Sequence, residues 1–440
     1  MGQCSCGAWN SFTEERVRPE AQPGRGRGGA HVPAAGAAKP RALCEITSGT
    51  ADRIDTGIGE LNRVLGGGLT KGTLTLIAGE PGIGKSTLIL QAAVLMARRG
   101  LSVLYVSGEE SAEQIRMRAD RVAAGDIPGS LNVMTETNIG AVIDAIEAGS
   151  PDFLIIDSIQ TMYAEDVSSA AGGVSQVRIC TDALMRAGKE RSIPVFIVAH
   201  VTKAGELAGP KIIEHLVDCV LSFSGDRNLD FRLLTANKNR FGTTSEVGAF
   251  EMRPEGLAEI TDLSGCLLDG PLGQTEGTIA TATYEGTRPL LLELQALTAS
   301  AGTGFPRRSS IGLDTSRLSM ILAVLEKKVR LDLSGSDVYV NIVGGVKPEG
   351  TSSDLACALA IWSSAKNIVI PSGVIAVGEI GLAGEIRYVR GAEKIAAEAA
   401  GLGFTRFILP QSNLPKTKAP PGLTLVGASD IREAIALLQL

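Results

Sequence analysis

Residues 73–99 read TLTLIAGEPGIGKSTLILQAAVLMARR, and this stretch decides the fold. Its centre, residues 79–86, fits the phosphate-binding pattern G-x-x-x-x-G-K-[ST] in full, between an apolar run and a helical pattern. Glycines let successive backbone N–H groups curl round phosphates, and the start of the helix adds a partial positive charge. The stretch therefore predicts a strand, a phosphate-binding loop and a helix of an α/β domain.

The loop chemistry assigns ATP and Mg²⁺ as ligands. Lys85 is expected to reach the β- and γ-phosphates, and the Ser86 hydroxyl to ligate Mg²⁺. A second buried strand, FLIID, ends in Asp157, which is expected to hold the same Mg²⁺ through water; the alternative is an aspartate that only ends a strand. The residues expected to surround the nucleotide are Gly79, Glu80, Pro81, Gly82, Ile83, Gly84, Lys85, Ser86, Thr87 and His200.

A third acid is needed to orient the attacking water. The strand predicted at 103–107 is followed by Glu109 and Glu110, at the sheet edge where ligands of open α/β sheets bind. Glu109 is the predicted water-polarising base and Glu110 the alternate; both could instead cap the next helix. His200 ends another predicted strand, as a γ-phosphate sensor or as a structural histidine.

Composition bounds the class of protein. The 440 residues carry a net charge of −6 and 4% aromatics, which excludes a uniformly basic nucleic-acid binder but not a local basic stripe. The 7 cysteines, an odd and scattered set, do not form a disulfide framework. No apolar run is long enough to cross a membrane. We expect a soluble, cytoplasmic protein without membrane contact.

The pattern along the chain divides it. Residues 16–42 are rich in Gly, Pro, Ala and Arg and predict a flexible linker. Short apolar runs alternating with helical stretches then predict a mostly parallel sheet, and a second pattern begins near Gly265. Strands are expected at 74–78, 103–107, 153–157, 194–199, 217–223, 231–237, 278–284 and 338–343, and helices at 316–328, 353–366 and 391–401.

Several longer segments carry a resemblance to the RadA (Sms) family of bacterial DNA-repair proteins. It runs over nearly the whole chain, and KNRFG after a nucleotide-binding core is far more specific than the phosphate-binding loop alone. The segments are 57–87, YVSGEES (105–111), HVTKAGELAGPKIIEHLVD (200–218), KNRFGTT (238–244), EGTRPLLLELQAL (285–297) and 305–328.

The resemblance implies an architecture and an activity. It implies a RecA-like P-loop ATPase core, residues 43–262, followed by an α+β Lon-protease-like domain of ribosomal S5 type, residues 263–440. It also implies a homo-hexameric DNA motor that drives branch migration on single-stranded and branched DNA, in cooperation with a RecA-type recombinase. Lys238 and Arg240 would meet a neighbouring subunit's γ-phosphate, as arginine fingers do, unless they form only a solvated basic turn.

The N-terminus departs from the family pattern. Family members begin with two C-x-x-C pairs, whereas here residues 1–15 hold only Cys4 and Cys6, spaced C-x-C, and Cys44 lies beyond the linker. Tetrahedral zinc needs four ligands. We therefore expect the remnant of a zinc finger, from truncation or natural degradation, and no stable zinc site.

The second departure concerns peptidase activity. Ser352 falls about where Lon has its nucleophile, but the position of the lysine base aligns with Glu393, and Lys394 lies one helical step, about 100°, away. A serine without a base is a weak nucleophile, so peptidase activity is not expected. The domain is expected instead to support ring assembly and DNA contact through Arg307, Arg308 and Lys347.

Two alternative functions remain open. Glu109 and Glu110 also resemble the pair of acids in KaiC-like ATPases, which have no DNA role, although KNRFG and the Lon-like segment do not resemble that group. The other alternative is an ATP-dependent Ser–Lys protease. ATP turnover stimulated by DNA separates the motor from the first alternative, and protein cleavage that depends on Ser352 would support the second.

Overall fold

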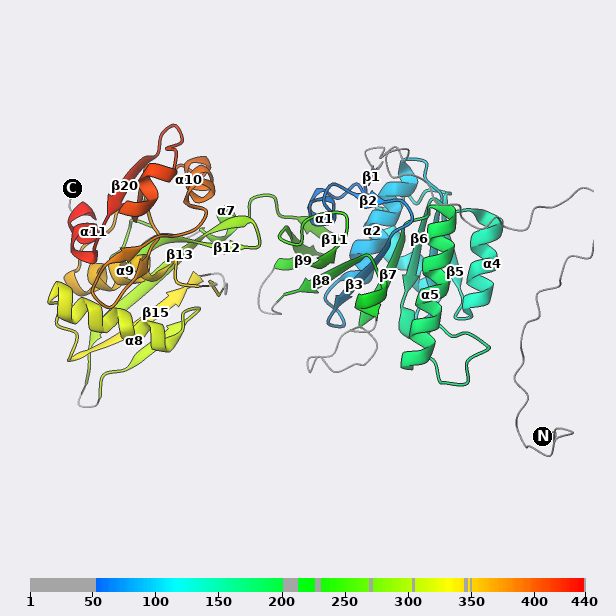
Figure 1. Cartoon of the computed structure of the whole chain (residues 1–440), viewed down its shortest axis with the longest axis horizontal. Helices are drawn as coiled ribbons and strands as arrows, with labels where there is room; N and C mark the ends of the chain where they lie inside the picture. Colours follow the sequence, from blue (N-terminus) through cyan, green and yellow to red (C-terminus); the bar gives the residue numbers. More distant parts are fainter. Residues whose placement is uncertain are drawn as a thin grey trace, which may run out of the picture. The chain divides into compact units, whose positions relative to one another are not determined.

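The strands of the protein form two large sheets, of nine and seven strands, that share no strand (Figure 1). They are seen in a computed structural model that describes residues 53–200, 213–225, 231–268, 272–302, 305–343, 347–348 and 350–438. Two small pairs accompany the large sheets: β1 (Arg53–Ile54) with β2 (Leu69–Thr70), and β17 (Glu379–Ile380) with β18 (Ile386–Arg387). The predicted α/β class is confirmed.

The nine-stranded sheet has the order β11-β10-β9-β8-β3-β7-β6-β4-β5. Its strands from β8 to β5 are parallel to one another, whereas β9, β10 and β11 extend the sheet as an antiparallel meander. The bounds are β3 Leu74–Gly79, β4 Val103–Ser107, β5 Leu131–Thr135, β6 Phe153–Asp157, β7 Val195–His200, β8 Cys219–Ser224, β9 Phe231–Asn239, β10 Val247–Arg253 and β11 Gly256–Glu259.

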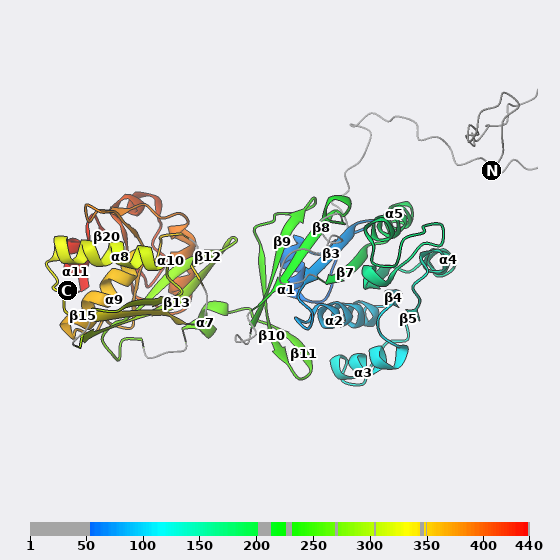
Figure 2. The same ribbon diagram turned by 90° about the horizontal axis from the view of Figure 1, so that it is seen from below.

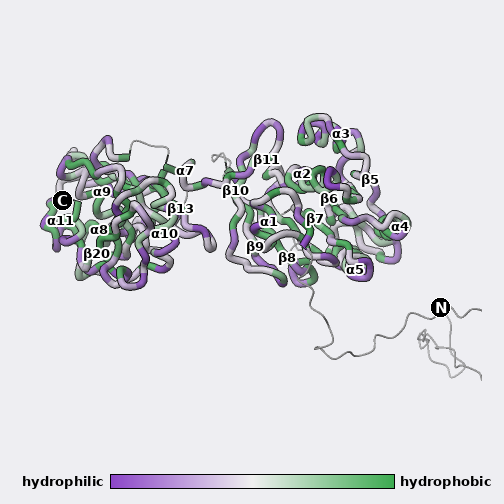
Figure 3. Tube along the Cα trace, turned by 90° about the horizontal axis from the view of Figure 1, so that it is seen from above, coloured by the Kyte–Doolittle hydropathy of each residue, from purple (hydrophilic) through white to green (hydrophobic). Residues whose placement is uncertain are grey.

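Helices cover both faces of this sheet, which explains why its central strands are apolar along their whole length. Ile77 and Phe153 pack with α1 (Gly59–Leu65), α2 (Lys85–Arg98) and α3 (Ala112–Val122). The alternate residues Leu76 and Leu154 pack with α4 (Ile139–Gly149) and α5 (Val174–Arg191) on the other face (Figure 2). Figure 3 shows the hydrophobic residues gathered on the inner elements and hydrophilic residues on the outer loops.

Most of the parallel strands match the sequence prediction closely, but β5 was not predicted, and the neighbouring β8 and the antiparallel part differ from it. The strand expected at 217–223 begins only at Cys219, because a short helical turn ends just before it. The strand expected at 231–237 continues to Asn239, so Lys238 lies within β9 rather than after it. The hairpin of β10 and β11 was not predicted at all, and it proves important for the site described below.

The seven-stranded sheet has the order β14-β15-β13-β12-β16-β19-β20 and mixes parallel and antiparallel pairs. Helices α8 (Thr315–Val324), α9 (Asp354–Lys366) and α11 (Ile431–Leu438) cover one face, and α10 (Ala392–Gly401) covers the other. Helix α7 (Leu263–Leu267) precedes the sheet. The strand bounds are β12 Thr278–Glu285, β13 Arg288–Ser300, β14 Arg308–Ile311, β15 Ser336–Ile342, β16 Val374–Ala376, β19 Arg406–Pro410 and β20 Thr424–Ala428.

One predicted helix changes its winding. The segment expected as a helix at 316–328 is α-helical only to Val324 and continues as a π-helical turn, Leu325–Val329, that ends at a left-handed Arg330 (φ 59°). The wider turn keeps both Leu325 and Leu331 in the core. An α-helix continued through both positions could not contain the left-handed Arg330 that lies between them.

The two large sheets come from consecutive stretches of the chain. The nine-stranded sheet ends at Glu259 and α7 begins at Leu263, close to the boundary predicted between 262 and 263. The domain boundaries themselves stay a prediction, and residues 1–15 and 16–42 lie outside the described residues. In the part of the chain that is described, no helix is long and apolar enough to cross a membrane.

Candidate nucleotide-binding site

The loop between β3 and α2 has the shape that its glycines predict. A side chain at Gly79 would place its Cβ 2.4 Å from the carbonyl oxygen of Phe223, and Gly84 has a φ of 113°, which side chains rarely adopt. Helix α2 begins at Lys85 without a side-chain cap, so its first N–H groups remain available to a ligand. The loop is therefore suited to bind phosphate through its backbone.

Lys85 points into this loop. Its side chain is only 3% exposed, and its Nζ donates to the carbonyl oxygens of Gly79 (2.8 Å) and Glu80 (3.0 Å). Burial lowers the pKa of Lys85 to about 8, although the nearby charges of Asp157 and Glu109 oppose that shift. A lysine ammonium group inside a glycine loop can donate charge-assisted hydrogen bonds to the oxygens of a phosphate chain.

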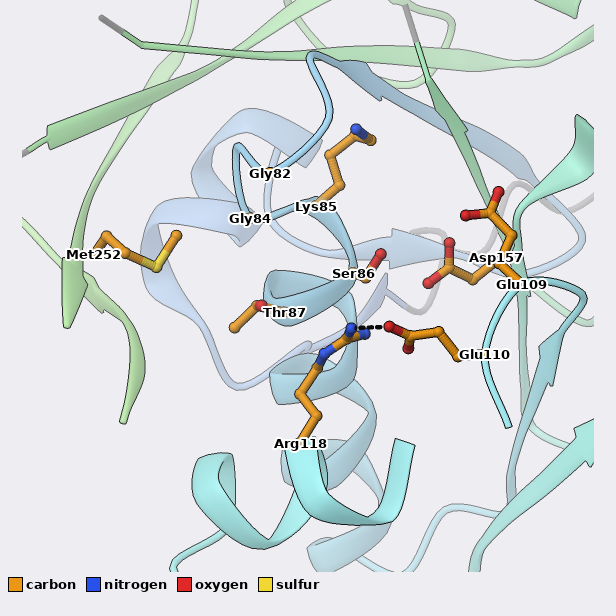
Figure 4. A pocket seen from close by; sticks show the side chains of 10 residues that line it. All are labelled: Gly82, Gly84, Lys85, Ser86, Thr87, Glu109, Glu110, Arg118, Asp157 and Met252. Carbon is orange, nitrogen blue, oxygen red and sulfur yellow. Dashed lines mark hydrogen bonds and ion pairs between the residues drawn. The ribbon is translucent and has the colours of Figure 1, made fainter. Parts of the chain in front are cut away.

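Three acids meet the loop at the carboxyl ends of β4 and β6. Ser107 pairs with Asp157 across these strands, so Asp157 and the following Glu109 and Glu110 reach the same edge of the sheet. They enclose a cavity of about 250 Å³ (Figure 4). Its walls are formed by Gly82, Gly84, Lys85, Ser86, Thr87, Glu109, Glu110, Arg118, Asp157 and Met252.

Asp157 is held by a residue that the sequence analysis missed. The Tyr105 hydroxyl, from the neighbouring strand β4, donates to Oδ2 of Asp157 at 2.5 Å, and both side chains are buried. Burial, and then the Asp157 charge, raise the pKa of Tyr105 well above its usual range, so the phenol stays protonated and donates. The sequence feature that could have indicated Tyr105 is its position in the predicted strand, two residues before the strand ends.

The two adjacent glutamates have different partners. The hydroxyl of Ser158 donates to Oε1 of Glu109, whereas Oε1 of Glu110 is ion-paired with Nη2 of Arg118 on α3. Within the described residues, Oε2 of Glu110 and Nη1 of Arg118 are buried without a hydrogen-bond partner. Arg118 was also missed, because the sequence does not show that α3 places this side chain at the cavity.

These groups fit ATP with Mg²⁺. Hydroxyl and carboxylate oxygens, here Ser86 and Asp157, are the ligands that Mg²⁺ prefers. The buried Lys85 and the free N–H groups of α2 suit the phosphates. A buried donor without a partner, Nη1 of Arg118, marks a place where an acceptor is missing.

Comparisons with known proteins show which family the chain belongs to. The chain is 45% identical over 436 residues to "DNA repair protein RadA" of Bacillus subtilis (strain 168), which covers 99% of this chain and 94% of that protein. The protein of the same name from Halalkalibacterium halodurans is 44% identical over 437 residues, with the same coverage. The chain belongs to the RadA family.

Other comparisons match only parts of this RadA-family protein. A family model described as "AAA domain" matches residues 39–206, and one described as "Subunit ChlI of Mg-chelatase" matches residues 312–413. Among solved structures, "Crystal structure of the RadB recombinase" covers 47% of this chain and 99% of its own, with a TM-score of 0.38 and 20% identity. The nucleotide-binding core is a P-loop ATPase core, and the chain belongs to a family of DNA-repair proteins.

Of the other predicted residues of the ATPase core, Lys238 and Arg240 do not line the cavity. His200 ends β7 opposite Gly79 of β3, which is the expected edge, but its side chain lies outside the described atoms. Lys238 donates to the carbonyl oxygens of Glu214 (2.7 Å) and Val217 (2.8 Å), at the end of the helical turn before β8. Burial, and then the neighbouring Arg240 charge, lower the pKa of Lys238.

Arg240 forms a second contact in the same region. Its Nη1 donates to Oδ1 of Asp218 at 3.0 Å, and Asp218 is buried while the Arg240 side chain is 53% exposed. The other carboxylate oxygen of Asp218 accepts from the backbone of Leu74. Lys238 and Arg240 are therefore both bound within their own chain, and the role of each toward a neighbouring subunit stays a prediction.

The predicted protease residues are not brought together. Oγ of Ser352 donates to the carbonyl oxygen of Ala282 (3.1 Å), whereas Nζ of Lys394 donates to that of Thr287 (3.4 Å). Glu393, at the position that aligns with the lysine base, is exposed. A cavity of about 710 Å³ is lined by Lys394 but not by Ser352.

The predicted DNA-contacting and zinc residues are only partly described. Arg307 and Lys347 are exposed, while Arg308 donates to the carbonyl oxygens of Ser336 and Leu333. Cys4, Cys6 and Cys44 lie outside the described residues. Within the described ranges no group of three or more His, Cys, Asp or Glu side chains is arranged to hold a metal ion by itself, and Cys180, Cys219, Cys266 and Cys357 are free thiols there.

Proposed function

We propose that this RadA-family protein is a DNA-dependent ATPase that acts as a homo-hexameric motor and promotes branch migration in recombinational DNA repair. The observation that carries the ATPase part is the gathering of Lys85, Glu109 and Asp157 around one glycine loop. The family supports the repair role. We infer that the protein works in the cytoplasm, on single-stranded and branched DNA, together with a RecA-type recombinase.

In this proposal the chain's own groups divide the work. Lys85 leaves the carbonyl oxygens of its loop and binds the β- and γ-phosphates. Ser86 and Asp157 would hold Mg²⁺, with Tyr105 fixing the orientation of the Asp157 carboxylate. When bound, Mg²⁺ would neutralise the charge that develops on the phosphates.

Glu109 is the proposed base for the attacking water. The Ser158 hydroxyl donates to one oxygen of its carboxylate, and the charge of Glu109 acts on Lys85 of the phosphate-binding loop. The Glu110 carboxylate, by contrast, forms an ion pair with Arg118. A base must keep a lone pair directed at the water, and Glu109 meets that need better.

Arg240 is the proposed link between subunits, because more than half of its side chain remains exposed. A cation that stabilises the neighbour's transition state would tie hydrolysis to ring assembly. Lys238, which is tied to backbone carbonyls, would position the turn that carries Arg240. Arg307 and Lys347 supply exposed positive charge for the DNA backbone.

The alternatives predict different results. A KaiC-like ATPase without a DNA role would hydrolyse ATP at a rate that single-stranded DNA does not change. An ATP-dependent protease would need Ser352 and a lysine base in contact, and these side chains donate to different carbonyl oxygens.

A three-strand branch-migration assay tests the proposal, with ATP turnover measured in the presence and absence of single-stranded DNA. We expect branch migration and turnover stimulated by DNA, and the loss of both in Lys85→Ala. Lys71→Ala is the matched control, because Lys71 is an exposed lysine before β3 that does not line the cavity. A protein that hydrolyses ATP yet neither responds to DNA nor moves branches would contradict the motor.

A further inference from the structure

Met252 is an apolar side chain in a polar cavity. It reaches the cavity from β10, and it is the one large apolar side chain among the described residues that form the cavity walls. It is 39% exposed, although residues 247–250 of the same strand are buried. The proposed hydrolysis uses Lys85, Glu109 and Asp157 of the cavity but gives Met252 no role.

The strand that carries Met252 is held firmly against the phosphate-binding loop. The side-chain amide of Gln91, on α2, donates to the carbonyl oxygen of Leu257 (3.0 Å) and accepts from its N–H (2.9 Å). Leu257 is the register partner of Met252 in the β10–β11 hairpin. Two residues before Met252, Phe250 packs edge-on against Phe223, with ring centroids 5.9 Å apart.

Met252 also approaches the loop closely. A Cβ at Gly84 would lie 2.8 Å from the terminal methyl of Met252, so only glycine at position 84 allows this contact. In Figure 4, Met252 lies on one side of Gly84, and Glu109 and Asp157 lie on the other. The cavity therefore has an acidic end, a central phosphate-binding loop and an apolar edge.

This arrangement fixes the direction of a bound nucleotide. The γ-phosphate belongs at the acidic end, where the metal ligands and the base gather, so the phosphate chain must lead away from it toward Thr87. We propose that Met252 packs against the base of the bound nucleotide and forms the apolar wall of its nucleoside subsite. This inference rests on the proposed ATP site and adds to it how the nucleoside half is held.

The chemistry of methionine suits this role. A thioether is polarizable and packs favourably on aromatic rings, and its flexible chain adapts to their faces. The hairpin, which is fixed on α2, presents the side chain without having to be ordered on binding. The contact offers no hydrogen bond to the base, so it contributes affinity for any nucleoside triphosphate through packing.

Binding of ATP and of inorganic tripolyphosphate, each with Mg²⁺, tests the inference by titration calorimetry. We expect Met252→Ala to weaken ATP binding about three- to tenfold and to leave tripolyphosphate binding unchanged. Met252→Leu keeps the apolar area and should bind ATP nearly as the unmodified protein does. Met117→Ala is the matched control, because Met117 is an exposed methionine of α3 that does not line the cavity.

Two results would overturn the inference. Unchanged ATP affinity in Met252→Ala would mean that the base lies elsewhere. A parallel loss of ATP and tripolyphosphate affinity would mean that Met252 only shapes the loop at Gly84. Neither result depends on DNA or on hydrolysis, so a protein without DNA-stimulated turnover would contradict the motor and leave this measurement interpretable.

Discussion

Glu110 and Arg118 form an ion pair in the wall of the nucleotide-binding cavity, and each keeps one buried polar atom without a partner in the described structure. The pair joins the end of β4 to α3, across eight residues. The Ser158 hydroxyl donates to Glu109, the neighbour of Glu110. Two adjacent acids of the same type are thereby given different electrostatic surroundings, and this difference can be tested.

Glu109→Gln should lower kcat for ATP hydrolysis at least about 100-fold while ATP still binds, because a positioned base typically contributes 10²–10⁴ in rate. Glu110→Gln should lower kcat less than about tenfold, because that carboxylate is paired with Arg118. Single-turnover hydrolysis and equilibrium ATP binding measure the two effects separately. The reverse ranking of the two variants would assign the base to Glu110.

Arg118→Leu should weaken ATP binding more than the double variant Glu110→Gln/Arg118→Leu does. The single change leaves a partly buried carboxylate without its cation, while the double change leaves no charge unpaired. The coupling between the two positions should then be clearly non-additive, as expected for residues in contact. Additive losses in a double-mutant cycle of ATP affinity would show that the pair does not act as a unit.

Local patterns predicted most of this site, and distant contacts account for the rest. The glycine loop and the acid that ends β6 are each set by a few consecutive residues, and their strands match the expected ranges within a residue. Arg118 and Met252 enter through packing of α3 and of the β10–β11 hairpin, which no short segment encodes. The turn at Pro254, between two apolar runs, was the available signal for that hairpin.

Arg240→Ala should keep ATP binding and lose the coupling of hydrolysis to branch migration. The substitution also leaves the buried carboxylate of Asp218 without its cation, so a stability loss could imitate a functional one. Asp218→Asn is the matched control, because it breaks the same pair and retains the arginine. Branch migration that fails in Arg240→Ala but persists in Asp218→Asn would support the role in trans; normal branch migration in Arg240→Ala would exclude it.

Ser352→Ala should change neither ATP turnover nor branch migration. The Ser352 hydroxyl is bound to the Ala282 carbonyl and has no lysine partner in the described structure, so it lacks the base that a nucleophile needs. Casein incubated with the unmodified protein and ATP should remain intact. Cleavage that disappears in Ser352→Ala would restore the protease alternative.

Arg317→Ala should strongly destabilise the seven-stranded sheet. Asp354, which is fully buried at the start of α9, receives Nε of Arg317 at 3.0 Å and the backbone N–H of Ile380 at 3.1 Å. Burial raises the pKa of Asp354, and the Arg317 hydrogen bond opposes this rise. Removing one partner of a buried pair costs about 3–5 kcal/mol.

The loss in Arg317→Ala should depend on pH in a defined direction. Without the guanidinium the folded-state pKa of Asp354 rises further above its unfolded value, so the folded protein binds more protons than the unfolded one in that interval. Stability of the variant should therefore increase as the pH falls from 7 toward 5.

Urea unfolding followed by fluorescence of the buried Trp362, on α9 itself, reports the domain concerned. Arg387→Ala, which breaks an exposed pair with Glu385, is the control and should shift the midpoint little. Equal losses at both pH values would mean that Asp354 does not carry its charge in the folded state, and that Arg317 stabilises the sheet through packing alone.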